Sequence, residues 1–283
     1  QRVRLSSPFL IRTVEPPLES VHGLSVRGLS RIGKRVVVEM DQEIYLVFHL
    51  MIAGRFQWKE AGAKIPGRLG LAAFDFDPGT LLLTEAGSKK RASLHIVRGE
   101  DGLSDLDPGG LEVLECDLKA FRAALGSARH TLKRALTDPT LFSGIGNAYS
   151  DEILHRAALS PFKRTDQLDT SEARRLFKSV QDVLQEWVAR LREERGDGFP
   201  KKVTAFHKEM AVHGKYEEPC PTCGSPVQRI RYAQNECNYC ATCQTEGRLL
   251  ADRALSRLLK EDWPRTLEEL ENRKRPAHQQ RGS

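Results

Sequence analysis

The sequence predicts an α+β protein of several domains: an N-terminal antiparallel β-sandwich, a helical C-terminal part, and a β-hairpin carrying four cysteines. Three observations predict this architecture. Short runs of β-branched and aromatic residues, separated by turn residues, fill the N-terminal part. Apolar residues recur at helical spacing from Asp117 onward. Two Cys-x-x-Cys pairs follow closer to the C-terminal end.

Four short runs are expected as strands of the N-terminal domain, which we place at residues 1–114. Turn residues at Gly33, Pro66-Gly67 and Asp77-Pro78-Gly79 separate the runs, and Asp107–Gly110 closes the domain. Regular short strands with this spacing favour an antiparallel sandwich or barrel. The expected strand segments are Val36–Val38, Ile44–Phe48, Leu81–Leu83 and Leu94–Val97.

The helical part, placed at residues 115–214, is expected to contain two helices joined by a tight turn. The first stops at Asp138-Pro139, the turn is Gly144–Asn147, and the second helix begins near Ala148. A longer helix is expected over residues 171–195, with one apolar face that packs in the core. That face consists of Leu176, Val180, Val183, Leu184, Val188 and Leu191.

The cysteine pairs are a strong indication of a metal site. Cys220 with Cys223, and Cys240 with Cys243, each turn two thiolates towards one point, and together they supply the four-sulfur set that Zn²⁺ favours. Cys237 also forms a Cys-x-x-Cys with Cys240 and could replace one ligand, although matched pairs favour Cys240 and Cys243. Four sulfur ligands leave no position for water, so the zinc is expected to be structural.

This zinc finger is placed at residues 215–248, and a C-terminal segment follows at 249–283. A short amphipathic helix is expected from Leu249 to Leu259. The segment ends in a polar, basic tail that begins at Arg273 and is expected to fray.

The composition limits the class of protein. The 283 residues include 44 Lys plus Arg and 38 Asp plus Glu, and the resulting net charge of +6 favours a polyanionic partner. Hydrophobic and charged fractions of 40% and 29% are typical of a soluble globular protein. With no apolar run long enough to span a bilayer and no leader, we expect no membrane partner and a cytoplasmic location, at the nucleoid in a bacterium.

The glycine-rich turn is a candidate phosphate site. Gly144 and Gly146 allow backbone amides to approach a phosphate closely, and Asn147 can offer its side-chain amide to a phosphate oxygen. Asn147 could instead simply cap the second helix, which is the commoner use of such a residue taken alone. The neighbouring four-cysteine finger favours the phosphate interpretation.

The order of β domain, helix–two-turn–helix and four-cysteine finger resembles the formamidopyrimidine-DNA glycosylase and endonuclease VIII family. The combination of turn and finger is specific, whereas either motif alone occurs elsewhere, and the resemblance covers most of residues 1–244. The matching residues are Gly33-Lys34, His49-Leu50, Leu132-Lys133, Gly144–Tyr149, Glu152, Gly214, and Pro219–Cys243 with Tyr239-Cys240 inside it.

The resemblance implies roles for individual residues. Lys34 matches a lysine of the β domain that holds phosphate beside the lesion, and Gly146-Asn147 matches the turn that grips the backbone flanking the flipped nucleotide. Lys133 matches a lysine of the DNA-facing helix, and Glu152 matches a structural glutamate. Lys34 and Glu152 are therefore our candidates at the catalytic centre, and Lys34, Lys133, Gly146 and Asn147 our candidates for DNA binding.

The resemblance also implies the reaction, which is excision of an oxidised base followed by strand cleavage at the abasic site. The damaged base leaves the stack at reduced cost, an amine attacks the sugar C1′, and the Schiff base allows elimination of the neighbouring phosphates. In the family, the amine belongs to an N-terminal proline, and the following glutamate acts in acid–base catalysis.

Neither of these two residues is present here, since the sequence begins Gln1-Arg2-Val3, and Arg2–Pro8 matches the family's strand after the first helix. Two interpretations are open. The sequence could be a fragment or have a misassigned start, which we favour because the helical and zinc parts remain coherent. Alternatively, the protein has lost catalysis and binds damaged or distorted DNA.

The finger differs from the family as well. The arginine five residues before the third zinc cysteine, which clamps phosphate in the family, is replaced by Asn235. Asparagine can hydrogen-bond to phosphate but carries no charge. Arg229 and Arg231 on the hairpin are candidates to compensate, and we include all three residues among the DNA-binding candidates.

The residues that fill the space left by the flipped base are the third difference. Met51 or Ile52 could serve as one plug. The family's arginine–phenylalanine loop corresponds to Gly87–Arg91, where Lys90 and Arg91 are the candidates and no aromatic is present. A plain solvated loop explains this basic run equally well, so the preferred lesion and opposite base stay open.

We therefore expect a monomeric DNA-repair glycosylase and abasic-site lyase with structural Zn²⁺, acting on double-stranded DNA with a damaged base or abasic site. A catalytically inactive damaged-DNA-binding protein of the same fold is the main alternative. A zinc-ribbon module that binds RNA is a third class, disfavoured because no RNA-reading motif is present.

Overall fold

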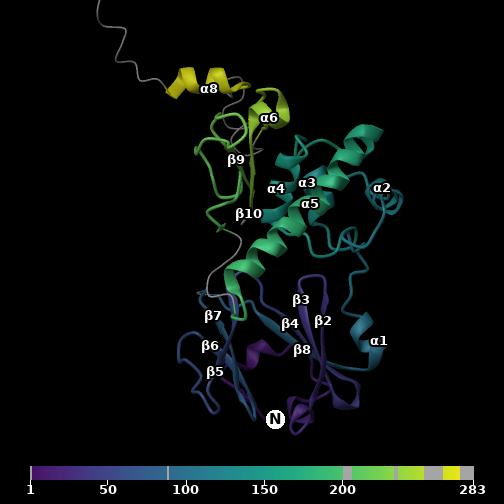
Figure 1. Ribbon diagram of the computed structural model, residues 1–283, viewed down its shortest axis with the longest axis vertical. Helices are drawn as coiled ribbons and strands as arrows, with labels where there is room; N and C mark the ends of the chain where they lie inside the picture. Colours follow the sequence, from purple (N-terminus) through teal and green to yellow (C-terminus); the bar gives the residue numbers. More distant parts are fainter. Residues whose placement is uncertain (1, 88, 200–205, 233–234, 252–263, 275–283) are drawn as a thin grey trace, which may run out of the picture. The chain divides into compact units, whose positions relative to one another are not determined.

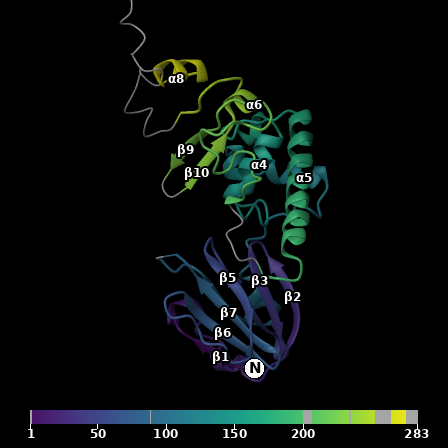
Figure 2. The same ribbon diagram turned by 60° about the vertical axis from the view of Figure 1, so that its left-hand side comes forward.

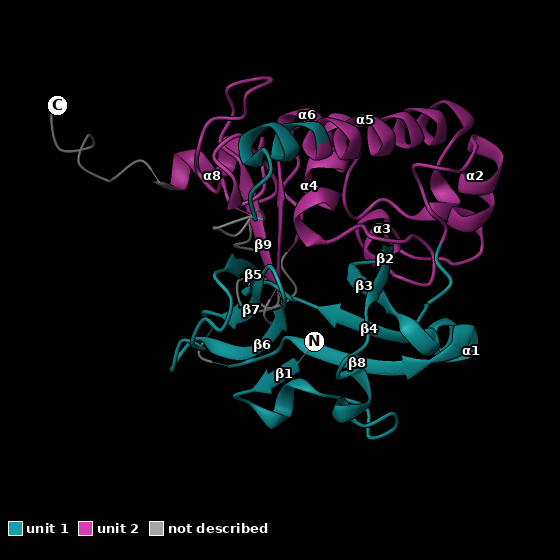
Figure 3. Cartoon of the chain, turned by 60° about the horizontal axis from the view of Figure 1, so that its bottom comes forward, with its two compact units in different colours: residues 1–110, 189–204 teal, residues 111–188, 205–283 magenta. Residues whose placement is uncertain are grey.

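The chain forms two compact units, residues 1–110 with 189–204 and residues 111–188 with 205–283 (Figure 3). The long helix α5 (Thr170–Arg195) contributes to both units. None of the helices that can be described is long and apolar enough to cross a membrane. The computed structural model describes residues 2–87, 89–199, 206–232, 235–251 and 264–274.

The N-terminal unit is an antiparallel β-sandwich, as predicted. One four-stranded sheet has the strand order β1-β6-β7-β5 and the other has the order β2-β3-β4-β8, and Figure 2 shows the two sheets. Every pair of neighbouring strands is antiparallel. The elements are β1 (Arg2–Leu5), β2 (Val26–Ile32), β3 (Arg35–Met40), β4 (Ile44–His49), β5 (Gly54–Lys59), β6 (Gly70–Phe76), β7 (Gly79–Glu85), β8 (Ser93–Arg98) and the short helix α1 (Gly99–Ser104).

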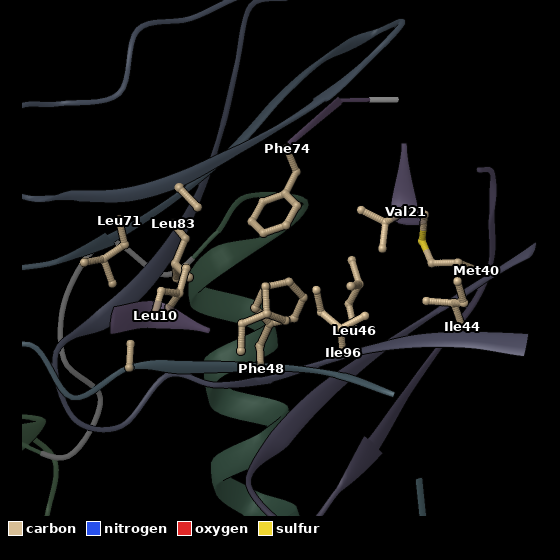
Figure 4. Packing of buried hydrophobic residues seen from close by; sticks show 13 residues of the cluster. Leu10, Val21, Met40, Ile44, Leu46, Phe48, Leu71, Phe74, Leu83 and Ile96 are labelled. Atoms are coloured by element: carbon tan, nitrogen blue, oxygen red, sulfur yellow. The ribbon is translucent and has the colours of Figure 1, made fainter. Parts of the chain in front are cut away.

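The sandwich is held together by apolar side chains from both sheets (Figure 4). In β4, the alternating residues Ile44, Leu46 and Phe48 are buried. The Phe48 ring meets the rings of Phe56 and Phe74 edge-on, with centroids 5.1 and 5.3 Å apart, so one side chain of the second sheet contacts two strands of the first. Burial of apolar area is therefore the main stabilising contribution in this unit.

The four predicted strand segments lie in β3, β4, β7 and β8, and the segment from Arg2 begins with strand β1. Strands β2, β5 and β6 were not among the predicted segments. Their sequences contain Gly28 in β2 and Ala72-Ala73 in β6, residues that do not favour strands by themselves. Pairing of β2 with β3, and of β5 and β6 with β7, stabilises these strands although their own sequences do not favour them.

The second unit contains the predicted pair of helices and the turn between them. Helix α3 ends at Thr137, next to the predicted stop at Asp138-Pro139, and α4 begins at Asn147. The ring of Phe121 packs on Phe142 and Phe177, with centroids 4.9 and 5.1 Å apart. The helices are α2 (Leu118–Gly126), α3 (Leu132–Thr137), α4 (Asn147–Arg156) and α5.

The predicted long helix is confirmed as α5, but one residue of its apolar face is corrected. Val188 is exposed, whereas Trp187 is buried against Tyr149 and His207, with ring centroids 5.8 and 5.1 Å apart. Trp187 lies four positions after buried Val183, so the buried stripe passes through the tryptophan.

The cysteine-containing segment forms the predicted hairpin, visible in Figure 1 as strands β9 (Gln228–Tyr232) and β10 (Asn235–Tyr239). Helix α6 (Ala241–Thr245) follows directly, and α8 (Leu267–Lys274) lies further along the chain. The predicted helix Leu249–Leu259 does not begin at Leu249, since residues 249–251 are not helical, and its remainder lies outside the described residues, as does the tail beyond Lys274.

Candidate nucleic-acid interface and metal centre

The four predicted cysteines meet at one point. The sulfur atoms of Cys220, Cys223, Cys240 and Cys243 all lie within 4.8 Å of one another, with Cys220–Cys243 at 3.9 Å and Cys223–Cys240 at 3.4 Å. A tetrahedral zinc site with bonds of about 2.3 Å requires sulfur atoms about 3.8 Å apart. The cluster therefore fits a four-coordinate metal ion. Cys237 lies in β10 opposite Ile230 and outside this cluster, an arrangement that favours Cys240 and Cys243 as the matched pair.

Local turns aim the sulfur atoms. The amide of Gly224, whose φ is +76°, donates to the carbonyl of Cys220, and the amide of Cys220 donates to the carbonyl of Ser225, which folds the first pair into a tight knuckle. Cys240 ends the hairpin and caps α6, so Cys243 returns to the same point after one helical turn.

Crowding and burial change the acidity of these thiols. Burial raises the pKa of Cys240 to about 11 and raises the pKa of Cys243 as well. Burial also opposes ionisation of Cys223, but hydrogen bonds from Ser225 and the neighbouring thiols lower the pKa of Cys223 to about 6. Several thiolates in so small a space repel one another, and a bound cation removes that cost.

The turn between α3 and α4 lies against the finger. Gly144 adopts φ +79°, a left-handed conformation that favours glycine, and Gly146 is the extended residue before the helix. Asn147, the first residue of α4, donates from Nδ2 to the carbonyl oxygen of Glu236 in β10 at 2.9 Å. The two motifs that carry the family resemblance are therefore bonded to each other within one unit.

A buried polar cluster joins the same elements more firmly. The Asp151 carboxylate is fully buried and accepts hydrogen bonds from Lys133 Nζ at 2.6 Å, His213 Nδ1 at 2.7 Å and the amide of Asn238 at 3.1 Å. Lys133 Nζ also donates to the carbonyl of Asn147 at 2.7 Å. One carboxylate thus connects α3, α4, the loop at 213 and the hairpin.

The structure corrects the expected role of Lys133 in DNA contact. The residue is only 4% exposed, and its ammonium is bound to Asp151 and to the Asn147 carbonyl, so its charge is not available to a phosphate. Lys133 holds the first residue of α4 in place instead.

Glu152 is also a structural residue here. Its buried carboxylate accepts three backbone hydrogen bonds, from the amides of Ala211 at 2.7 Å and of Val212 and His213 at 2.9 Å each. This arrangement fixes the loop that leads into the finger. The expectation that Glu152 matches a structural glutamate agrees with these contacts, and its acceptor positions are occupied by the protein itself.

The hairpin arginines differ in their surroundings. Arg229 stacks over the Tyr216 ring, 4.2 Å from the centroid, and lies 3.8 Å from the Glu236 carboxylate, while Arg231 is exposed. Asn235 is exposed at the start of β10. Arg231 and Asn235 are thus exposed residues of the hairpin, whereas the Arg229 guanidinium is held against Tyr216 and Glu236.

In the N-terminal unit, Lys34 occupies the turn between β2 and β3, directly after Gly33, whose φ is +57°. Its side chain is exposed, although partial desolvation lowers the pKa of its ammonium. The structure thus places Lys34 at a hairpin tip, where a long cationic side chain can reach a ligand.

The residues proposed to fill the lesion space lie on two neighbouring loops. Gly54 pairs with Glu85 across β5 and β7, so the turn with Met51 and Ile52 and the loop with Lys90 and Arg91 start side by side. Met51 and Ile52 are 42% and 63% exposed. Gly54 is required here, because a Cβ atom would lie 2.3 Å from the Leu50 carbonyl oxygen.

A buried carboxylate that sequence reasoning missed shapes the second loop. Glu85 is 2% exposed and accepts from the amides of Arg91 at 2.9 and 3.0 Å and of Ala92 at 3.1 Å, and Lys90 Nζ donates to the Glu85 carbonyl. Nothing in the sequence separates Glu85 from a surface glutamate. Asp151 could have been found, because it lies four residues after Asn147 and so shares its helix face.

Comparison with known proteins agrees with this geometry. The formamidopyrimidine-DNA glycosylase N-terminal domain matches residues 1–87, and the H2TH domain of the same glycosylase matches residues 110–195. A formamidopyrimidine-DNA glycosylase of Thermus thermophilus is 33% identical over 242 residues, which covers 80% of this chain and 84% of that protein. An uncharacterized formamidopyrimidine-DNA glycosylase-like protein of Mycobacterium tuberculosis is 38% identical over 155 residues, covering 55% of this chain and 94% of that protein.

Solved structures agree with the sequence comparison. A Lactococcus lactis FPG mutant in complex with a Fapy-dG containing DNA is 26% identical with a TM-score of 0.75, and covers 86% of this chain and 91% of that chain. A complex of Lactococcus lactis Fpg with an abasic site containing DNA is 25% identical with a TM-score of 0.74, over the same shares. The fold, the turn joined to a four-cysteine finger and these similarities together show that the chain belongs to the formamidopyrimidine-DNA glycosylase family of DNA-repair proteins.

Proposed function

We propose that this protein binds double-stranded DNA at a damaged base or abasic site, excises oxidised bases as an N-glycosylase, and cleaves the strand at the abasic site by elimination. The observation that carries the proposal is the hydrogen bond from Asn147 to the Glu236 carbonyl, because it makes the glycine turn and the finger hairpin parts of one surface. The Lactococcus lactis relatives were solved with abasic or Fapy-dG DNA, which supports the same substrate class.

Phosphate contacts supply most of the binding free energy in this proposal. The first amides of α4 have no partner within the helix and attract anions, and Asn147 has a second N–H besides the one used by Glu236. Arg231 and Asn235 add contacts from the hairpin, and Lys34 adds one from the sandwich. Lys133 acts indirectly, by holding the Asn147 carbonyl.

We further propose that the four clustered thiolates bind Zn²⁺ in a structural role. The donor set and the spacing of the sulfur atoms fit this ion, and four protein ligands leave no coordination position for water or substrate. Its role would be to fix the conformation of the knuckle and of the hairpin, in which the Glu236 carbonyl accepts the hydrogen bond from Asn147.

The reaction needs a base that has left the stack and an amine that attacks the sugar. Attack at C1′ forms the bond from nitrogen to carbon as the bond to the base breaks, and the Schiff base then acidifies the neighbouring C–H so that phosphate leaves by elimination. The resemblance assigns the amine to an N-terminal proline that precedes strand β1 in the family. In this proposal, the residues of the turn, the hairpin and the sandwich named above bind and orient the DNA. We propose that the repair takes place in the cytoplasm.

Borohydride trapping on abasic duplex tests the enzymatic part of the proposal, because only a Schiff base is reduced to a stable covalent adduct. A trapped complex with strand cleavage supports the glycosylase and lyase. Binding without adduct on a protein whose native start has been verified by mass spectrometry supports instead the catalytically inactive DNA-binding alternative and overturns the enzymatic proposal.

Affinity measurements test the binding residues. Asn147→Ala and Lys34→Ala should each weaken binding to abasic duplex by about tenfold to a hundredfold, since a charge-assisted contact is worth about 1.5–3 kcal/mol. Wild-type affinity should fall steeply with salt. Lys178→Ala is the matched control, because Lys178 is an exposed cation already paired with Asp182 along α5. Equal affinity of the Asn147 and Lys34 variants and the control would remove these two assignments.

A further inference from the structure

A histidine of helix α4 contacts the four-cysteine cluster. His155 Nε2 lies 3.2 Å from the Sγ atom of Cys220, and both residues are buried. His155 is not one of the expected metal ligands, and it was not singled out from the sequence. It is the described residue that joins the helix behind the glycine turn directly to a sulfur atom of the finger.

The chemistry of the sulfur atom fixes the direction of this hydrogen bond. A cysteine that ligates a metal ion is a thiolate, which has no proton and can only accept. When zinc is bound to Cys220, the imidazole therefore carries its proton on Nε2 and donates this hydrogen bond to the sulfur atom. A hydrogen bond from an uncharged ring to an anionic sulfur is charge-assisted, and such bonds are stronger than neutral ones.

His155 is the last of four contacts on one face of α4. Residues 147, 151, 152 and 155 follow helical spacing, and each reaches the finger or the loop before it. The three earlier contacts go to the Glu236 carbonyl, to the Asn238 amide with His213, and to the amides of residues 211–213. His155 extends this series to the metal-binding sulfur itself.

We propose that His155 is a positioning residue of the metal site, whose N–H bond to Cys220 withdraws charge from the thiolate, slows loss of the metal and fixes the first knuckle against α4. A four-thiolate zinc centre carries two net negative charges, and in a buried site a donor to sulfur reduces that charge. The inference rests on the proposed zinc binding. His155 would then be a residue that does not bind the metal itself but contacts one of its ligands. Through this contact, metal binding and the position of α4 depend on each other.

Two measurements on the full-length protein with metal bound test this. The rate of zinc release to an excess of a chromophoric chelator should rise about tenfold or more in His155→Phe, which keeps a ring but removes the donor. After replacement of zinc by Co²⁺, the sulfur-to-cobalt charge-transfer band should move to longer wavelength in His155→Phe, because a sulfur atom without the hydrogen bond gives up its electron more easily.

Two further variants separate this role from simple packing. His155→Gln places an N–H close to the Nε2 position and should restore much of the wild-type release rate and band position. Arg156→Ala is the matched control, because Arg156 is the next residue of α4 but pairs with Glu186 at 2.8 and 3.0 Å on an exposed surface. It should leave both readouts unchanged.

The outcomes distinguish the inference from the function on which it rests. Wild-type protein without stoichiometric zinc would overturn the proposed metal site and the role of His155 with it. Zinc-loaded wild-type protein whose His155→Phe variant has the same release rate and the same cobalt band would overturn only the role of His155. Faster release in His155→Phe with no restoration in His155→Gln and an unshifted band would assign the effect to packing and likewise overturn the proposal.

Discussion

The β-sandwich and the junction between α4 and the finger are stabilised by opposite means. At the centre of the sandwich is Phe48, surrounded by apolar side chains from both sheets. At the centre of the junction is Asp151, a buried carboxylate bound by Lys133, His213 and the Asn238 amide. The first arrangement depends on shape and area, and the second depends on every hydrogen-bond partner being present.

This difference determines what each region tolerates. Apolar contacts are non-directional, so a slightly smaller side chain in the sandwich loses some buried area and leaves the rest intact. A buried charge that loses its partner keeps the full cost of its desolvation. The junction is thus more easily broken, but it holds Asn147 and the hairpin in a single defined arrangement.

Removing the metal should have the largest effect. Cys240→Ala should abolish zinc binding and unfold the finger, because a structural zinc site contributes about 10 kcal/mol or more to folding. Hydrogen exchange should increase across β9, β10 and α6 and stay unchanged across β3 and β4. Cys237→Ala, which lies outside the cluster, should keep one zinc per chain. Loss of zinc in Cys237→Ala but not in Cys240→Ala would reverse the ligand assignment.

Breaking the buried ion pair should have the next largest effect. Asp151→Asn leaves the Lys133 ammonium buried without its counter-charge and should lower the free energy of unfolding of this unit by about 3–5 kcal/mol. Ile96→Val in the sandwich should cost only about 1 kcal/mol. Urea unfolding followed by hydrogen exchange in each unit measures both.

The double variant Lys133→Met/Asp151→Asn makes the comparison sharper. It removes both charges and should be more stable than Asp151→Asn alone, since the unpaired charge and not the lost volume causes the destabilisation. A double variant no more stable than the single one would show that the junction is governed by packing, as the sandwich is.

A variant of Glu85 tests whether the hydrogen bonds of a buried carboxylate stabilise a loop of the otherwise apolar sandwich. Glu85→Ala leaves the amides of Arg91 and Ala92 without their acceptor and should destabilise the loop by about 1–3 kcal/mol, seen as faster hydrogen exchange at residues 89–92. The exposed Glu100→Ala serves as control. Unchanged exchange at the loop would mean that β7 and β8 alone determine its conformation.

The smallest change in stability is expected when the pH is lowered until Asp75 is protonated. Arg4 donates to both oxygens of Asp75 at 2.7 and 2.8 Å, and this hydrogen bond lowers the pKa of Asp75 below its ordinary value. The resulting stability is present above the ordinary pKa and is lost as the pH falls through the lowered one. Wild type should lose about 1 kcal/mol more than Asp75→Asn between pH 6 and pH 2. Parallel curves for both proteins would exclude the contribution.

The same contrast explains what the sequence predicts. Strand segments such as Ile44–Phe48 and the long helix from Thr170 follow from local apolar patterns, and the four-cysteine cluster follows from spacing. The partners of Asp151 do not, because His213 is 62 residues away and Asn238 is 87 residues away. No local pattern states which buried donors meet a given carboxylate.

The role expected of Lys133 fails for the same reason. The DNA-facing role of Lys133 is inferred from the family resemblance, and only the folded arrangement shows that its ammonium is buried against Asp151. By contrast, Asn147 and Glu236 each belong to a motif that is recognisable in the sequence, but the hydrogen bond between them joins motifs that are far apart along the chain. Sequence reasoning identified both motifs, and the structure supplies the bond between them.

The adjacent carboxylates Asp151 and Glu152 together bind two segments: Asp151 accepts from the hairpin amide of Asn238 and from the His213 side chain, and Glu152 accepts from the amides of residues 211–213. A protein engineer could not transplant this finger as an independent cassette. A recipient scaffold would need the same acidic pair on its acceptor helix, with Asn147 one turn earlier and His155 one turn later, or the grafted finger would have nothing to dock on.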